Sequence, residues 1–191
     1  GLIPSHPQSY HHFMYEHFFQ HVNVAEHNIY IPSGNTSKYR AFCSWYEQRI
    51  EECGGIDLQI LGIGSDGHVA FNEPGSSLSS RTRLKTLAKP TIDDNARFFE
   101  NRADVPLSAI TRGVGTIMEA RQLGLLANGP NKAQAVAAAV EGPVTSMVTA
   151  SALQLHPSAK VFLDDGAASQ LKMREYYDWI EEHRPGAPDN R

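Results

Sequence analysis

The chain has 191 residues, of which 41% are hydrophobic, and its 17 Lys and Arg against 21 Asp and Glu give a net charge of -4 at pH 7. This length favours one compact domain with its own core. The charge balance supplies no broad basic field, which argues against nucleic acid and anionic membrane surfaces as partners. No apolar run approaches the roughly 18 residues of a membrane-spanning helix.

The cysteines and the start of the chain indicate the cellular setting. Cys43 and Cys53 lie in a segment with helical patterning, and the sequence has no CxxC pair. We therefore expect reduced thiols and a cytoplasmic protein. The opening "GLIPSHPQSYHH" lacks the basic and apolar regions of a signal peptide and has no initiator Met. We expect that the sequence starts at a cut.

The first half of the chain begins with helical patterns. Aromatic and aliphatic residues recur at helical spacing over residues 7–22 and again over 37–53, where Gly54 and Gly55 follow. Between them, "NIYIP" at 28–32 predicts a short strand. Residues 56–63 are rich in Ile and Leu and flanked by glycines, which predicts a strand buried on both faces.

The second half alternates strands and helices. Strands are predicted at 83–88, 107–111, 122–128 and 159–165, and helices at 91–99, 130–142, 145–155 and 169–183. We expect the polar tail 184–191 to be mobile.

This alternation predicts a single α/β domain over 1–191. Parallel neighbours need crossover connections, so we expect a Rossmann-like, mostly parallel sheet flanked by helices on both faces. Ligands of such sheets bind beyond the carboxyl ends of the strands, so the loops that follow strands are where chemistry is expected.

The loop 64–77, "GSDGHVAFNEPGSS", carries the strongest chemical signal. It holds Asp66, His68 and Glu73 within eight residues. A histidine between two carboxylates is held in one tautomer and becomes a better base, which suits proton transfer on a sugar hydroxyl. Nearby glycines leave room for a ligand or for unusual backbone angles: Gly62, Gly64 and Gly67. The alternative is ordinary turn chemistry with a hydrogen-bonded loop histidine.

The segment "LGIGSDGHVAFNEPGSSLSSRTRLKTL" resembles the signature of glucosamine-6-phosphate deaminases, with its "DGH", "AFNEP" and "SSRTR" elements. The similarity extends over about residues 1–165, through "NARFF", "GVGTIMEA" and "LQLHPSA", and weakens in the C-terminal helix.

The resemblance implies specific roles. His68 would open the pyranose ring by moving a proton between the ring oxygen and the anomeric hydroxyl, oriented and charged by Asp66 and Glu73. Arg97 and Lys132 would contact the 6-phosphate, since cations suit that dianion. The implied substrate-binding set is Gly62, Arg97 and Lys132.

A second set matches residues that bind an effector in regulated members of the family. Ser76, Arg83 and Lys85 would hold the phosphate of N-acetylglucosamine 6-phosphate between subunits, which implies a homo-oligomer. The alternative is that alternate basic residues of "RTRLKT" face solvent along one side of a strand.

The implied reaction needs no cofactor. Ring opening exposes an aldehyde, the C2 proton moves to C1, and water releases ammonia from the resulting iminium. In the family the C2 base is an Asp in a "DE" pair just before the segment that resembles "GLIPSHPQSY", and a phosphate-binding loop lies further upstream. Relative to the family, we therefore expect a sheet that is incomplete at the N-terminal side and that exposes a hydrophobic face and a strand edge.

A metal site and two other functions are the alternatives to this interpretation. His17 and His21 stand four positions apart on the first predicted helix, near His11 and His12, but without HExxH we predict no metal there. Two alternative functions are a sugar-phosphate-binding protein or inactive piece of a longer enzyme, and, less favoured, a 6-phosphogluconolactonase.

Overall fold

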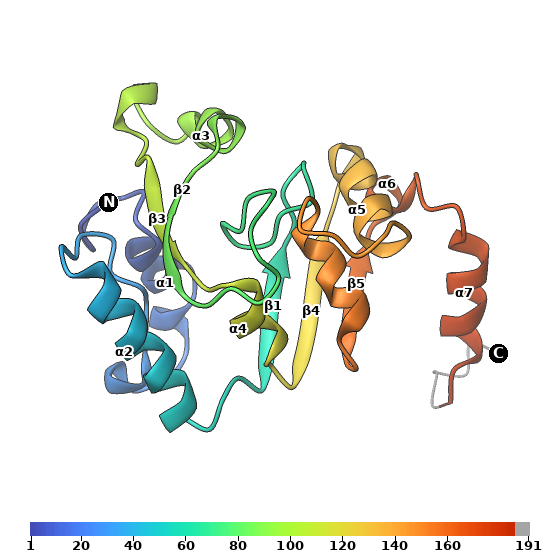
Figure 1. Ribbon diagram of the computed structural model, residues 1–191, viewed down its shortest axis with the longest axis horizontal. Coiled ribbons are helices and arrows are strands. Elements are labelled where there is room, and N and C mark those ends of the chain that lie inside the picture. The colour runs from blue at the N-terminus through green and yellow to red at the C-terminus, as the bar shows by residue number, and fades with distance from the viewer. Residues whose placement is uncertain (186–191) are drawn as a thin grey trace.

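The computed structural model describes residues 1–185. Its centre is a parallel sheet of three strands in the order β1-β4-β5 (Figure 1). The strands are β1 (Leu58–Gly62), β4 (Gln122–Ala127) and β5 (Ala159–Leu163). They confirm three of the predicted strands and the α/β class, because helical segments connect each parallel pair.

One face of this sheet carries the main core. Leu61, Leu123 and Leu125 point into it and are buried. The covering elements are α4 (Val114–Met118), α5 (Ala133–Val140) and the 3-10 helix η5 (Thr149–Leu155). The small residues of α5, Ala135 and Ala139, allow it to pack closely on the same cluster.

A second sheet is an antiparallel hairpin. It pairs β2 (Arg83–Thr86) with β3 (Ser108–Thr111), and between them lie α3 (Lys89–Ala96) and the short η3 (Arg102–Asp104). The two predicted strands are confirmed, but they are separate from the parallel sheet. A small cluster of Leu87, Ile92 and Val105 forms the core of this unit.

The N-terminal part contains α1 (Tyr10–His17), two single-turn 3-10 helices (Phe19–His21 and Glu26–Asn28) and α2 (Tyr39–Glu52). The strand predicted at 28–32 is wrong. Its backbone pairs with no other strand, and the carbonyl of Tyr30 accepts a hydrogen bond from the Tyr46 hydroxyl instead, at 3.3 Å.

The C-terminal part departs from the prediction at two helices. The predicted helix 145–155 is a 3-10 helix confined to η5. The predicted helix 169–183 begins later, as α7 (Arg174–His183), and is preceded by the unpredicted α6 (Asp165–Ala168). Asp164 caps α6 by accepting a hydrogen bond from Ala167 N, and it also accepts one from Gly129 N, which follows β4. Most of the tail predicted to be mobile, residues 186–191, lies outside the described residues.

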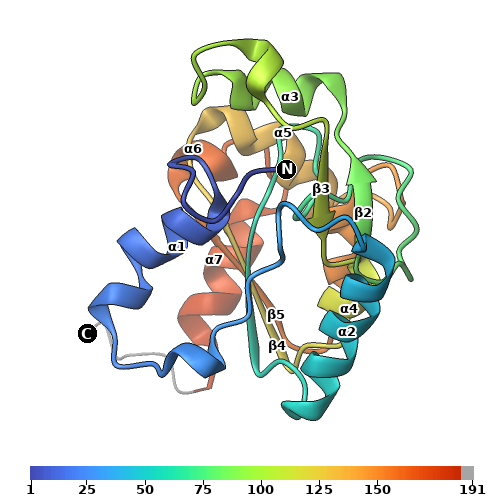
Figure 2. The ribbon, with the colours of Figure 1, turned by 90° about the vertical axis from the view of Figure 1, so that its left-hand side faces the viewer.

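The other face of the parallel sheet is open. Leu58, Ile60, Leu126 and Phe162 lie on it, each between 50% and 63% exposed. The prediction that β1 is buried on both faces is therefore wrong, whereas the expected exposed hydrophobic face is present. Figure 2 shows α4 on one side of the strands and α7 on the other.

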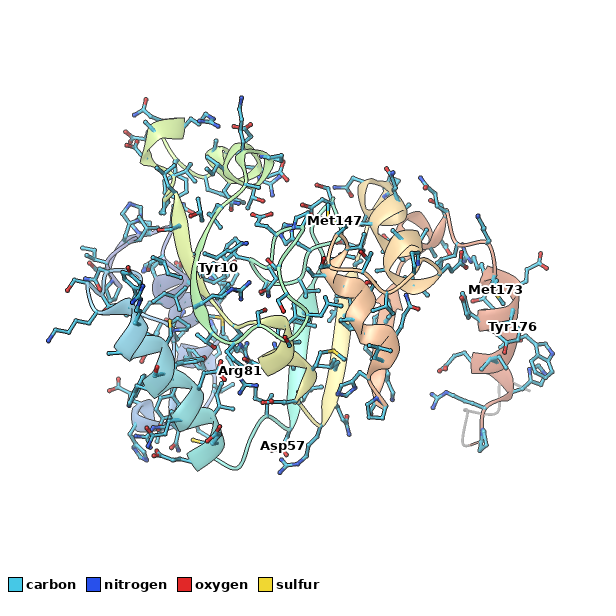
Figure 3. All side chains as sticks on the ribbon, in the orientation of Figure 1. Tyr10, Asp57, Arg81, Met147, Met173 and Tyr176 are labelled. Carbon is cyan, nitrogen blue, oxygen red and sulfur yellow. The ribbon has the colours of Figure 1, made fainter. Side chains whose placement is uncertain are left out.

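Helix α7 buries no residue of its own and stands apart from the parallel sheet, beyond β5 (Figure 1). Met173, just before α7, and Tyr176 on it lie well away from the strands (Figure 3). They belong to an exposed apolar stripe that continues through Trp179 and Ile180. No helix among the described residues is long and apolar enough to cross a membrane.

Candidate active site

The loop 64–77 starts at the carboxyl end of β1, beside the end of the neighbouring strand β4. It turns back at once, because Gly64 N donates to the carbonyl of His68 at 2.8 Å and Gly67 N to that of Gly64 at 3.0 Å. Gly67 has φ +85°, a left-handed angle that glycine adopts without steric cost. This tight turn presents Asp66 and His68 at the edge where ligands of parallel sheets bind.

The three predicted acid-base side chains meet in this loop. His68 Nδ1 lies 2.6 Å from Asp66 Oδ1 and 3.7 Å from Glu73 Oε2. Asp66 Oδ1 also accepts the backbone N–H of His68 at 3.1 Å. Asp66 is exposed, His68 is half-buried, and Glu73 is only 4% exposed. Both carboxylates thus face the same ring nitrogen of His68.

That pairing determines which ring nitrogen is free. An imidazole whose Nδ1–H is donated to a carboxylate has its lone pair on Nε2. Nε2 of His68 makes no hydrogen bond with any described residue. The arrangement therefore suits a base that accepts a proton through Nε2.

Gly64 gives the His68 ring its place. A Cβ added at Gly64 would lie 2.4 Å from both Cε1 and Nδ1 of that ring. No real Cβ contact is so short, so any larger residue would displace the imidazole. The glycine pattern of the loop thus has a steric function beside its conformational one.

Glu73 is fixed by its other oxygen. Oε1 accepts a hydrogen bond from Ala88 N, just before α3, at 3.0 Å. Oε2 is buried and has no hydrogen-bond partner. A buried carboxylate oxygen without a partner is costly, so Oε2 is available to a charged His68 or to a ligand.

Two threonines from outside the loop, and Asn72 within it, hold the loop in shape. Thr149 Oγ1 accepts from Val69 N at 3.2 Å and donates to the carbonyl of Asn72 at 2.9 Å. Thr111 Oγ1 accepts from Phe71 N at 3.1 Å. The Asn72 amide donates to the carbonyls of Val69 and Arg112.

The sequence carries little signal for these supporting residues. Thr111 and Thr149 are 40 and 80 positions from their loop partners, and nothing local marks them. Asn72 lies inside "AFNEP", so its place in the motif is the one signal that could have pointed to it.

The phosphate-contact candidates lie on other elements. Lys132 ends the short η4 (Pro130–Lys132), which follows β4 at the same edge of the sheet, and is half-buried. Arg97 follows α3 and is exposed, with its guanidinium carbon 4.7 Å from the centroid of the Phe98 ring. Gly62 ends β1 and has open space where a Cβ would point. No hydrogen bond or ion pair links Arg97 or Lys132 to the triad within residues 1–185.

The effector candidates are more deeply placed than solvent-facing residues would be. Along β2, Arg83 and Lys85 are half-buried while Leu84 is exposed. Arg83 Nη1 donates to Asn72 Oδ1 at 2.9 Å, and burial lowers the pKa of Arg83. Ser76 is buried and its hydroxyl has no partner. Arg83 thus packs against the loop 64–77 through Asn72.

Comparison with known proteins shows the family. The profile of the glucosamine-6-phosphate isomerases/6-phosphogluconolactonase family matches residues 2–165. The chain belongs to this family. Members of it include a glucosamine-6-phosphate deaminase of Arthrobacter sp. (strain FB24), 50% identical over 185 residues, which are 97% of this chain and 71% of that protein.

Solved structures of the family agree with this assignment. A structure described as a monomeric glucosamine-6-phosphate deaminase has a TM-score of 0.87 and 42% identity, over 89% of this chain and 70% of that one. A 6-phosphogluconolactonase from Trypanosoma cruzi shares 22% identity with a TM-score of 0.53, over 69% of this chain and 52% of that one. The second likeness shows the fold alone, and the lactonases are distant relatives.

Proposed function

We propose that this chain acts in the conversion of glucosamine 6-phosphate to fructose 6-phosphate and ammonia, in the breakdown of amino sugars. The observation that carries the proposal is the convergence of Asp66, His68 and Glu73 in a deaminase-like loop. High identity to a named deaminase over nearly the whole chain supports it.

Ring opening follows from the geometry of the triad. With Nδ1–H donated to Asp66, Nε2 of His68 takes the proton of the anomeric hydroxyl and returns it to the ring oxygen. The imidazolium formed between these steps is stabilised by the Asp66 and Glu73 carboxylates. Proton transfer at C2 needs a further carboxylate, which we assign to none of the described residues.

Phosphate binding is proposed for Arg97 and Lys132. Lys132 follows β4 at the same sheet edge at which the loop leaves β1. Arg97 is brought toward the loop by its own hairpin, since Phe71 of the loop and Phe99 pack on the same small cluster. A guanidinium fork and a point charge together suit a phosphate dianion. Gly62 would leave room for the substrate at the end of β1.

Several finer proposals rest on the family alone. They are the hydrolase class, a cytoplasmic location, and a homo-oligomer with an N-acetylglucosamine 6-phosphate site at Ser76, Arg83 and Lys85. The relative described as monomeric bears on the last of these. The homo-oligomer is tested by size-exclusion chromatography with light-scattering detection, with and without N-acetylglucosamine 6-phosphate. A monomer under both conditions would contradict an effector site between subunits.

The deciding experiment is ammonia release from glucosamine 6-phosphate by the purified chain, with His68→Ala as the test variant and His17→Ala on α1 as the matched control. We expect release by the wild type and by His17→Ala, with a carboxylate of a neighbouring subunit taking the C2 proton, and a fall of about 10²–10⁴-fold in His68→Ala. Sugar-phosphate binding without release would favour the binding-protein alternative. Hydrolysis of 6-phosphogluconolactone in its place would favour the lactonase.

A further inference from the structure

We propose that Asp66, His68 and Glu73 also bind a divalent transition-metal cation of the Zn²⁺ type, and that this cation inhibits the site. The inference goes beyond the proposed function, because binding of the cation requires no turnover. It concerns an inhibitory ligand and not a cofactor of the reaction.

The first observation is the spacing of the donor atoms. One ligand atom from each of the three side chains lies within 4.8 Å of the other two. Within residues 1–185 this is the one group of three His, Cys, Asp or Glu side chains with such spacing. Ligands that share one ion must approach one another in this way, since each bonds to it at about 2.0–2.2 Å.

The second observation is the unpartnered oxygen of Glu73. Oε2 is buried without a hydrogen-bond partner and lies 3.7 Å from His68 Nδ1. Oε1 is held by Ala88 N, so the carboxylate cannot turn away to find another partner without losing that bond. A cation between Oε2 and Nδ1 would satisfy both atoms.

The donor set selects the class of cation. One imidazole nitrogen and two carboxylate oxygens suit Zn²⁺ and its first-row neighbours, whereas Ca²⁺ and Mg²⁺ prefer oxygen ligands alone. Three protein ligands leave a fourth position open to water or to a sugar hydroxyl. Asp66 is exposed and His68 half-buried, so the ion can reach the site from solvent.

Inhibition follows from the tautomer of His68. A cation on Nδ1 needs the lone pair of that nitrogen, so the ring proton of the neutral imidazole moves to Nε2. Nε2–H can no longer accept the proton of the anomeric hydroxyl. The bound cation also neutralises the two carboxylates that would stabilise an imidazolium. Binding therefore reverses the two properties that suit His68 to ring opening.

The test is calorimetric titration of the chelator-stripped chain with Zn²⁺, with Co²⁺ absorption in the visible range as a second probe. We expect one cation per chain. Glu73→Gln keeps the shape of the side chain, and it should weaken binding by at least about tenfold, the size found when even an outer-shell partner of a metal site is lost. His68→Ala should weaken it at least as much. Circular dichroism checks that both variants are folded.

The histidines of α1 provide the control, since they could bind Zn²⁺ by themselves. The double substitution His12→Ala and His17→Ala should leave the affinity unchanged. Unchanged affinity in Glu73→Gln or His68→Ala, or its loss in the α1 double variant, would overturn the proposal.

Activity is measured separately, in buffered free Zn²⁺. We expect ammonia release to fall as the calorimetric site fills, and full turnover at saturation would overturn the inhibitory part. If the chain releases no ammonia at all, the proposed function fails, while the titration still decides whether the cation site exists.

Discussion

The triad and the phosphate-contact candidates differ in how the chain holds them. Asp66, His68 and Glu73 lie in one loop that hydrogen bonds from distant threonines keep in shape. Arg97 is exposed at the end of α3, and its guanidinium lies over the ring of its neighbour Phe98. Proton transfer requires correct geometry before the substrate arrives, whereas a phosphate dianion attracts long cationic side chains from some distance. The supporting hydrogen bonds are thus concentrated at the triad, where we expect proton transfer to require fixed geometry.

Removal of His68 should have the largest effect. In His68→Ala the ring-opening base is lost, and turnover should fall by the 10²–10⁴-fold typical of general acid-base catalysis, about 3–5 kcal/mol. Affinity for the sugar phosphate should change little, which a binding titration with glucosamine 6-phosphate checks. Wild-type turnover in the folded variant would show that the rigid loop is not the chemical centre.

Arg97→Ala should act on binding instead. Loss of one charge-assisted contact should weaken affinity for glucosamine 6-phosphate by about 1.5–3 kcal/mol. Unphosphorylated glucosamine serves as the control ligand, because its affinity should not change. An equal loss for both ligands would mean that Arg97 contributes to the fold and not to phosphate recognition.

Gly64→Ala tests the steric basis of the rigid loop. The added Cβ must displace the His68 ring, so we expect about 1–3 kcal/mol of destabilisation together with reduced turnover. Chemical denaturation measures the first and ammonia release the second. Gly62→Ala is the matched control for stability, since nothing lies within 4 Å of its added Cβ. Equal stability of the two variants would contradict the close fit.

The smallest effect is expected far from the loop, at Glu47 of α2. Burial raises the pKa of this carboxylate, but hydrogen bonds from Thr82 and Thr116 and the charge of Arg81 outweigh burial and lower it. A carboxylate whose pKa is lowered in the folded protein stabilises the fold at pH values above its ordinary pKa. This stabilisation is lost as the pH falls through the lowered pKa. We would measure the free energy of unfolding of the wild type and of Glu47→Gln at a series of pH values. The wild type should be the more stable protein near neutral pH, and the difference should shrink as the pH falls. A difference independent of pH would contradict this.

Local signals account for what could be predicted from the sequence. The strand 122–128 and the helix 130–142 are found within a few residues, because hydrophobic runs and flanking Gly or Pro are local features. The triad is found because all its members lie within one short loop. The family resemblance adds Arg97 and Lys132, which have no local signal of their own.

The remaining features depend on contacts between distant residues. The antiparallel pairing of β2 with β3 joins strands more than 20 residues apart, and pairing partners cannot be read from either strand. The five-residue helix α4 is too short for a clear helical period. Leu58 and Ile60 have the composition of core residues, and only the arrangement of the helices shows that they face outward.

The open sheet face has a consequence for every solution measurement on this chain. Contiguous apolar surface of this kind associates with itself or with any hydrophobic solute. Self-association is a mass-action process, so the apparent melting temperature should depend on protein concentration. A fluorescent dye such as ANS should brighten with the folded chain, and Phe162→Ser together with Leu126→Ser should dim it. Affinities are therefore best measured at several dilutions.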